Sequence, residues 1–326
     1  MNTNPSMERK SWKASRRLFY VVPLAAMFIP LVANDYLQFM VNIMMVYVLV
    51  TVGFNLVIGN LGQLAFANTA FFGIGAYTTA ILMSHLGFTY DIALVSAAVV
   101  GGLAGLLASI TALRGIRLYY LAIITMAFGE LMRWVYIHAD KITHGTDGLP
   151  LYNISVFGMS MHSDTAKFYV FLLITVLVVK GVSNLLRSRV GRAIIAIRDN
   201  EMTTASLGIS TSNYIILTFV MSGSIVGIAG AMFAATTERV FPESFGLTEV
   251  IVHFAMVMVG GSGSLIGSVI GGAVLTILPE YFRQFPGMSE LFFGGIIITI
   301  LLFLPKGLAS LLAKLSPVFH DRYYRD

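Results

Sequence analysis

The chain has 326 residues, of which 57% are hydrophobic and only 11% are charged. Soluble domains carry about 25% charged residues, and a compact domain of this length has too little interior to hide so much apolar surface from water. The composition therefore excludes an ordinary soluble protein and indicates a membrane protein.

The basic residues give the chain a net charge of +5 and gather in clusters beside apolar runs. The main clusters lie at 9–17, 187–198 and 314–325. Nucleic-acid binding is the competing interpretation of a basic protein, but this spacing is typical of membrane loops. We therefore expect a lipid environment and no nucleic-acid partner. The absence of cysteine excludes disulfides and thiolate metal sites.

The chain starts with a basic segment, residues 1–17, and an apolar run over 18–34 that together resemble a signal peptide. Two prolines interrupt the run, and Asn34-Asp35-Tyr36 is a poor cleavage site. We interpret the run as a retained first span, preceded by a cytoplasmic N-terminus.

Ten apolar runs follow one another along the chain, at 18–34, 38–58, 63–86, 91–113, 118–137, 167–186, 213–236, 249–261, 265–282 and 290–305. Most reach the length of about 20 residues that a membrane span needs. The run 249–261 is too short for a regular span, so we expect a broken or re-entrant segment there. The pattern predicts an all-α, polytopic membrane protein of about ten transmembrane helices, with a membrane domain over 18–312 and a tail over 313–326.

Loop charges predict the orientation of these spans. With the N-terminus in the cytoplasm, Arg114, Arg117 and the arginines of 187–198 fall on the cytoplasmic side. If the segment 249–282 crosses twice, the basic tail is also cytoplasmic, whereas a single crossing puts it outside. We prefer the double crossing, with both termini inside.

Glycines interrupt the apolar runs in both halves of the chain. Three small-residue stripes predict close helix packing, at Gly101-x-x-x-Gly105, Gly223-x-x-x-Gly227 and Gly267-x-x-x-Gly271. The segment 59–63, followed by 72–77, also resembles the segment 260–264, followed by 267–272. Such pairs suggest an internal repeat with a binding site between its two copies.

Polar groups inside the apolar runs are candidates for lining a solute path. The side chains are Asn55, Gln63, Asn68, Thr69 and His253, with hydrogen bonding between helices as the alternative role. Exposed backbone at Gly260, Gly261 and Gly263 is a further candidate, because peptide dipoles can meet the charges of a zwitterion.

Glu130 and Arg133 lie three residues apart on one predicted span and can pair on one helix face. The pair can have a structural role or can contribute to the solute path, and the sequence leaves both possibilities open.

The chain contains no nucleotide-binding G-x-x-x-x-G-K-[ST] motif and no H-E-x-x-H motif, and its histidines are scattered. We therefore expect no enzyme activity, no metal site and no cofactor in this chain.

The polar segment 188–209 has the pattern of two short helices. Val190, Ala193, Ile194 and Ile197 form one apolar stripe, Asn200 can cap the second helix, and Gly208 can end it. A basic loop lying on lipid and a docking element for a soluble partner are both compatible with this pattern.

The chain resembles the permeases of branched-chain amino acid ABC importers, the LivH/LivM family, and is nearer to LivM. The resemblance covers about residues 40–312. Its motifs are Gly62-Gln63-Leu64-Ala65-Phe66, Gly73-Ile74-Gly75-Ala76-Tyr77, Thr146-Asp147-Gly148-Leu149, the segment from Gly191-Arg192-Ala193 through Arg198-Asp199-Asn200-Glu201 to Leu207-Gly208-Ile209, Gly260-Gly261-Ser262-Gly263-Ser264-Leu265-Ile266-Gly267, and Leu304-Pro305-Lys306-Gly307-Leu308. Gln63 and Thr203-Thr204 depart from the usual residues of the family.

The resemblance implies a multi-pass subunit of the bacterial inner membrane. Its implied partners are a second, homologous permease, two cytoplasmic ATPase subunits that use ATP and Mg²⁺, and a periplasmic solute-binding protein. The segment 188–209 then matches the ATPase-coupling helix, with the candidate residues Gly191, Arg192, Ala193, Arg198, Asp199, Asn200, Glu201 and Gly208.

The long external loop around Thr146, Asp147 and Gly148 is a candidate docking surface for the binding protein, and a solvated loop without a partner is the alternative. The expected function is ATP-driven import of branched-chain or other hydrophobic amino acids by alternating access. Urea or a short amide as the solute, and an ion-coupled secondary transporter, remain as alternatives.

Overall fold

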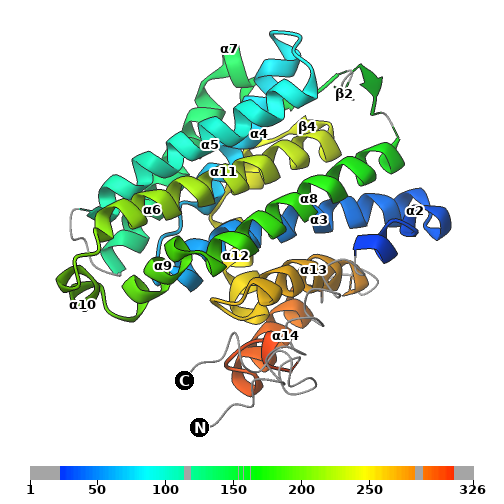
Figure 1. Ribbon diagram of the computed structural model, residues 1–326. Helices are drawn as coiled ribbons and strands as arrows, with labels where there is room; N and C mark the ends of the chain where they lie inside the picture. Colours follow the sequence, from blue (N-terminus) through cyan, green and yellow to red (C-terminus); the bar gives the residue numbers. More distant parts are fainter. Residues whose placement is uncertain are drawn as a thin grey trace.

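A computed structural model describes residues 23–113, 119–152, 154–156, 158–161, 163–282 and 289–311. Within them the chain is almost entirely helical (Figure 1). The helices are α2 (Ile29–Val32), α3 (Asp35–Asn55), the π-helix η1 (Leu56–Asn60), α4 (Asn68–Ser84), α5 (Tyr90–Leu113), α6 (Tyr119–His138), α7 (Asp140–Thr143), the 3₁₀-helix η2 (Gly145–Asp147), α8 (Asp164–Arg187), α9 (Arg189–Asp199), α10 (Glu201–Ser206), α11 (Thr211–Thr237), the 3₁₀-helix η3 (Pro242–Phe245), α12 (Leu247–Gly260), α13 (Leu265–Phe282) and α14 (Ser289–Phe303).

Four two-residue strands belong to the connections between helices. They are β1 (Leu149–Pro150), β2 (Ser155–Val156), β3 (Met159–Ser160) and β4 (Arg239–Val240). β1 pairs antiparallel with β4, and β2 with β3. The basic N-terminus at 1–17, Arg114, Arg117 and the tail 313–326 lie outside the described residues, so the orientation rule is not tested there.

Six helices in the described part of the chain are long and apolar enough to cross a membrane: α3 with η1, α5, α6, α8, α11 and α13. The prediction of an all-α polytopic membrane protein is therefore confirmed by these six helices together with shorter apolar ones. The predicted runs 63–86, 249–261 and 290–305 give the shorter helices α4, α12 and α14. Residues 23–34 of the run 18–34 are described, and they are helical at 23–26 and in the four-residue helix α2.

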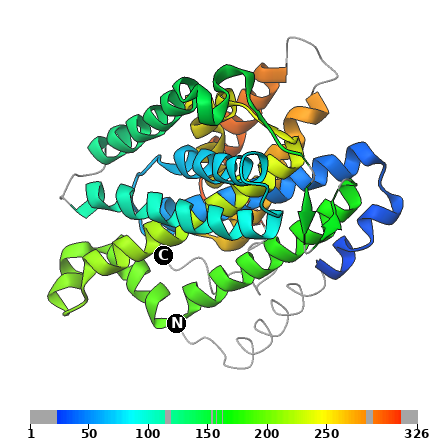
Figure 2. The same cartoon turned by 90° about the horizontal axis from the view of Figure 1, so that it is seen from above.

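The bundle has two ends. α9 and α10 lie at one end, which we call the α9 end, and the connection 139–163 lies at the other, the loop end (Figures 1 and 2). α11 starts after α10 and ends at Thr237, and the carboxylate of the next residue, Glu238, accepts a hydrogen bond from Lys167 in the first turn of α8. The chain then returns through η3 and α12 to the α9 end, and α13 leaves that end again. The segment 249–282 therefore contains two helices that run in opposite directions, the short α12 and the longer α13.

The helices approach one another most closely at glycines. Gly101 and Gly105 of α5 lie against the backbone of α11 at Gly223 and Phe219, so closely that a Cβ on either glycine would overlap backbone atoms. Gly267 lies in the same way against Gly260. The predicted stripes are thus packing positions, where the small residue lets van der Waals contact between backbones replace a hydrophobic driving force.

The order of elements repeats in the two halves. A long helix, an irregular segment, a short helix and two further helices occur as α3–α6 and again as α11–α14. α3 runs from the loop end to the α9 end, whereas α11 runs in the opposite direction. α3 packs antiparallel on α13, since Thr51 Oγ1 donates to the carbonyl of Ser268 and Asn55 to that of Ser264. α11 packs on α5, so each half contributes one long helix to the other, as expected for an inverted repeat.

Candidate functional site

The end of α3 is an interrupted helix. α3 continues into η1, the chain turns at Gly62 with φ +77°, and residues 61–67 follow without helical structure before α4 begins at Asn68. A π-helix within a helix often marks a functional site. The amide of Phe66 in the irregular segment donates to Thr125 Oγ1 of α6, at 2.7 Å, so protein groups rather than lipid satisfy this backbone donor.

The turn between α12 and α13 closes against this interruption. Asn55 Nδ2 donates to Ser268 Oγ (2.7 Å) and to the carbonyl of Ser264 (3.1 Å), and Asn55 Oδ1 accepts from the amide of Gly263 (2.8 Å). Asn60 Nδ2 also donates to the carbonyl of Gly263. We call this contact, formed by 55–62 and 260–268, the junction. It joins the two glycine-rich segments that the sequence suggests as repeat partners, but that pairing is wrong: 59–63 follows the first long helix of its repeat, whereas 260–264 lies between the second and third helices of the other repeat.

The junction covers most of the glycine backbone that we expected to face a solute. Gly260 and Gly261 are buried, and Gly261 lies against Lys306 and Gly307, in the segment after α14. The amide of Leu308 donates to the carbonyl of Val259. Only Gly263 is partly exposed. The expectation of open backbone therefore fails at Gly260 and Gly261, because the chain beyond α14 folds back over them.

The remaining path candidates lie where α4 meets α6 and α12. Asn68 and Thr69 begin α4 and are buried, and Asn68 Nδ2 lies 3.0 Å from Nδ1 of the fully buried His253. Thr69 Oγ1 faces Gly129 of α6. Gln63 is partly exposed in the irregular segment. Four buried polar atoms of these candidates have no hydrogen-bond partner among the described residues: Asn68 Oδ1, Thr69 Oγ1, Gln63 Oε1 and His253 Nε2. In contrast, both the side-chain oxygen and the side-chain nitrogen of Asn55 are hydrogen-bonded.

The segment 188–209 forms the two predicted short helices. Ser188 Oγ accepts from the amides of Val190 and Gly191 at the start of α9, and Asn200 Oδ1 accepts from the amide of Thr203 at the start of α10. Ala193, Ile194 and Ile197 of the predicted stripe are buried, Val190 is half-buried, and Gly208 follows α10 with φ +83°. These local predictions are confirmed, because side-chain caps and a 3.6-residue period depend on nearby residues alone.

Arg198 extends from α9 over the junction. Its side chain lies along Gly62, and its Nη1 lies 2.5 Å from the position that a Cβ on Gly263 would take. One side chain thus contacts both the turn after η1 and the turn between α12 and α13. Arg198 is nevertheless exposed, as are Arg192, Asp199, Asn200 and Glu201, whereas Gly191 is buried against the backbone of Leu185 and Leu186.

Two apolar side chains of this segment were not foreseen as functional. Met202 of α10 and Leu207, directly after this helix, are each 77% exposed, at the far end of the protrusion. Large apolar side chains exposed together are typical of a docking surface. The sequence contains a signal for this role, because the two residues are apolar, lie in a polar segment and are not part of the apolar stripe of α9.

The loop-end candidates lie together around η2. Thr146 and Asp147 are exposed, and the carbonyl of Asp147 accepts from Arg239 Nη1 at 3.0 Å. Gly148 is buried beside Phe241 and has φ +73°. Arg239 and Phe241 follow α11, so the loop is tied to the second repeat as well as to the first.

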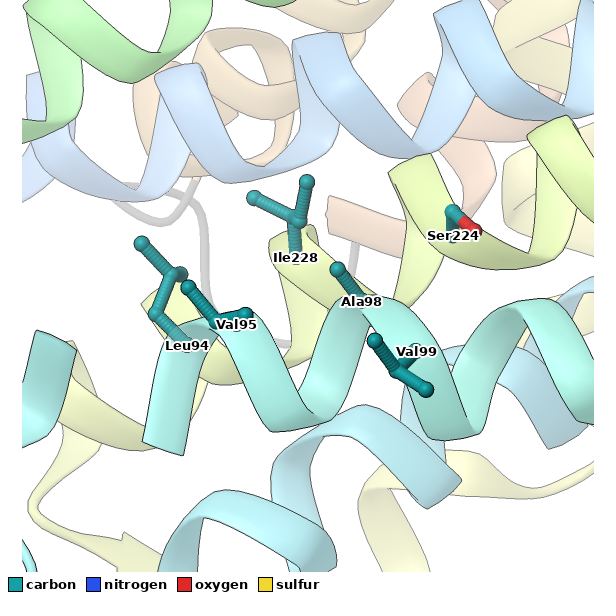
Figure 3. Close-up of a pocket in the computed structure, with 6 residues that line it drawn as sticks. All are labelled: Leu94, Val95, Ala98, Val99, Ser224 and Ile228. Carbon is teal, nitrogen blue, oxygen red and sulfur yellow. The ribbon is translucent and has the colours of Figure 1, made fainter. Parts of the chain in front are cut away.

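The hollow drawn in Figure 3 lies elsewhere, between α5 and α11. It has a volume of about 250 Å³ and is lined by Leu94, Val95, Ala98, Val99, Ser224 and Ile228. Ser224 is the one polar residue in this lining, and the exposed face of α5 around it is apolar. This composition suits lipid and offers little to a charged solute.

Comparison with known proteins places the chain among membrane permeases. A family model described as the permease component of branched-chain amino acid transport systems matches residues 36–301. The permease protein LivM of the high-affinity branched-chain amino acid transport system is 32% identical in Salmonella typhimurium and in Escherichia coli, over 81% of this chain and 68% of each relative. LivH of Escherichia coli is 26% identical over 80% of this chain and 90% of that protein. No solved structure matches.

Proposed function

Since the chain belongs to the family of permease components of branched-chain amino acid transport systems, we propose that it is the membrane subunit of an ATP-driven importer of branched-chain amino acids. Its relatives are named for this class of solute. The importer requires a second, homologous permease, two ATPase subunits and a periplasmic solute-binding protein, and it works in the bacterial inner membrane.

The α9 end is the cytoplasmic end in this proposal. Arg187, Arg189, Arg192 and Arg198 all lie there, as the preference of basic residues for the cytoplasmic side requires. The chain after α14 meets the junction at the same end, which makes the C-terminal region cytoplasmic too. The loop end, with Thr146 and Asp147, then faces the binding protein.

The contact of Arg198 with the junction carries the mechanism. An ATPase that moves α9 also moves Arg198, and with it Gly62 of the first repeat and Gly263 of the second. The first segment is the irregular stretch between α3 and α4 and the second is the turn between α12 and α13, and such segments can bend without breaking regular helical hydrogen bonds. We therefore derive alternating access from one lever that acts on both repeats at once.

The test is Arg198→Ala in the full complex, with Arg189→Ala, an arginine that is also exposed at the start of the same helix, as the control. We expect the Arg198 variant to hydrolyse ATP while leucine uptake into proteoliposomes falls by about tenfold or more, an energetic coupling of about 1.4 kcal/mol. The Arg189 variant keeps most of its uptake. Normal uptake by the Arg198 variant would contradict the lever.

A further inference from the structure

α6 carries an ion pair within its span on a face that the chain does not cover. Glu130 Oε2 lies 3.3 Å from Arg133 Nη1, and the two side chains are 43% and 34% exposed. At a rise of 1.5 Å per residue they lie about 16 and 21 Å beyond Tyr119, and about 12 and 8 Å before His138, where α6 ends. Charged groups within a span are costly in contact with lipid. This face of α6 therefore borders water or another protein.

Arg133 also lies at the start of α12. Its Nε and Cζ are 3.7 and 3.8 Å from the position of a Cβ on Gly246, the residue that precedes α12. No side chain caps this helix, whose first amides carry the positive end of the helix dipole. Arg133 Nε has no hydrogen-bond partner among the described residues. The guanidinium of Arg133 therefore lies beside the N-terminus of α12, and its Nε donates to no acceptor among the described residues.

Two buried polar atoms without hydrogen-bond partners also lie near the first turn of α12, with the rings of Phe245 and Phe72 between them. Tyr136 Oη and the ring of Phe245, the neighbour of Gly246, both lie against Gly73 of α4. His253 Nε2 points toward the first turn of α12, where Glu249 Oε2 is 4.0 Å away. Tyr136 and His253 are buried, and both atoms lack a hydrogen-bond partner in the described part of the chain. Buried polar groups are normally paired, so unpaired ones from two helices point to a missing ligand.

We propose that Glu130, Arg133, Tyr136, Glu249 and His253, which we call the α6–α12 cluster, bind the zwitterionic head of the transported amino acid. Arg133 and the N-terminus of α12 receive the α-carboxylate. Glu249, with Glu130, receives the α-ammonium. The exposed side chains of Leu247 and Phe241 lie close in sequence to this helix start and offer apolar surface to the solute's side chain.

This assignment rests on the proposed function and adds the residues that contact the solute. The cluster is open on one side, so it binds weakly and releases the solute readily. Tight selection then belongs to the binding protein. The open side also explains why a charged pair can remain within the span.

Charge variants in the reconstituted complex separate a binding role from a structural one. In Arg133→Gln we expect leucine transport to fall by about tenfold or more, while ATP hydrolysis stimulated by the binding protein changes by less than about twofold. The double variant Glu130→Arg/Arg133→Glu restores an ion pair on the same helix face but puts the wrong charge beside α12. We expect it to stay inactive, whereas recovery of uptake would overturn the proposal.

A labelling experiment makes the test independent of activity. Because the chain has no cysteine, the substitution Thr248→Cys in the first turn of α12 introduces a single thiol. In the assembled complex we expect a charged, membrane-impermeant thiol reagent to label it, read by the mass of this chain, and excess leucine to slow the labelling. Isopentylamine, which lacks the carboxylate, should not slow it. Val99→Cys, on the apolar face of α5, is the control that should stay unlabelled.

The results distinguish the two proposals. Absence of labelling in the Thr248→Cys variant, or labelling that leucine leaves unchanged, would overturn the α6–α12 cluster as the solute site. A wild-type complex that fails to accumulate leucine would instead contradict the proposed function.

Discussion

The junction and the α6–α12 cluster are both polar regions in an apolar bundle, but they use their hydrogen-bonding groups differently. At the junction, Asn55 uses both its oxygen and its nitrogen in bonds to the α12–α13 turn. In the cluster, Arg133 Nε, Tyr136 Oη and His253 Nε2 have no partner among the described residues. A paired polar group within a membrane stabilises helix packing, whereas an unpaired one costs free energy. The comparison indicates that the first region joins the two repeats and the second is kept for a ligand.

The largest expected effect is at Gly59 in the junction. A Cβ there would overlap Asn55 Oδ1 and the amide nitrogen of Gly263, which is backbone and cannot rotate away. We expect Gly59→Ala to prevent recovery of folded protein, measured by size-exclusion chromatography in detergent. Gly181→Ala on α8, where a Cβ meets nothing within 4 Å, is the matched control and should be tolerated. Equal yields of the two variants would show that the junction is loosely packed.

Asn55→Ala tests the paired region without a steric clash. It leaves the Gly263 amide and Ser268 Oγ without their Asn55 partner. We expect a loss of about 2–4 kcal/mol in the free energy of unfolding, from several modest bonds and the penalty for an unpaired buried donor. Thermal unfolding in detergent measures it. An unchanged melting temperature would mean that water or lipid replaces these bonds.

A third test concerns a surface, the exposed apolar side chains of Met202 and Leu207 at the end of the α9–α10 protrusion. We expect the double variant Met202→Ser/Leu207→Ser to weaken binding of the ATPase subunits by about tenfold, or 1.4 kcal/mol, through lost apolar contact. Stability in detergent should not change, because both side chains are exposed. Co-purification at increasing dilution measures the binding. Unchanged association would place the ATPase contact on another face of α9 and α10.

The smallest effect is expected at Asn68, in the unpaired region. Asn68→Ala loses one hydrogen bond to His253 but also removes an oxygen that has no partner among the described residues. We expect a loss of about 0.5–1 kcal/mol, well below that of Asn55→Ala, by the same thermal measurement. A loss equal to that at Asn55 would remove the distinction between the two regions.

The helices of 188–209 could be predicted closely, whereas the interruptions could not. Ser188, Asn200 and Gly208 act on their immediate neighbours, so the sequence reveals their effect. In contrast, Leu64, Ala65 and Phe66 are as apolar as helical residues, and their irregular conformation depends on α6, through the bond from Phe66 to Thr125. For the same reason the run 63–86 has the length of a full span, whereas the helix within it, α4, begins only at Asn68.

The roles of the polar candidates were also beyond local information. Asn55 and Asn68 look alike in sequence, but the first meets residues around 264 and the second meets His253, each about two hundred positions away. The sequence likewise suggests open backbone at Gly260 and Gly261, because the segment that covers Gly261, at 306–307, lies beyond α13 and α14 in the chain. Glu130 and Arg133 form the predicted ion pair, since three residues on a helix place them on one face.

The central claim is that an ATPase partner drives solute through this subunit by way of α9 and Arg198. The most direct measurement is leucine uptake by proteoliposomes that contain the permease pair, with and without the ATPase subunits, in the presence of binding protein and ATP. The account predicts accumulation against a gradient only with the ATPases, and its loss in Arg198→Ala. Accumulation by the permeases alone, driven by an ion gradient, would contradict the account.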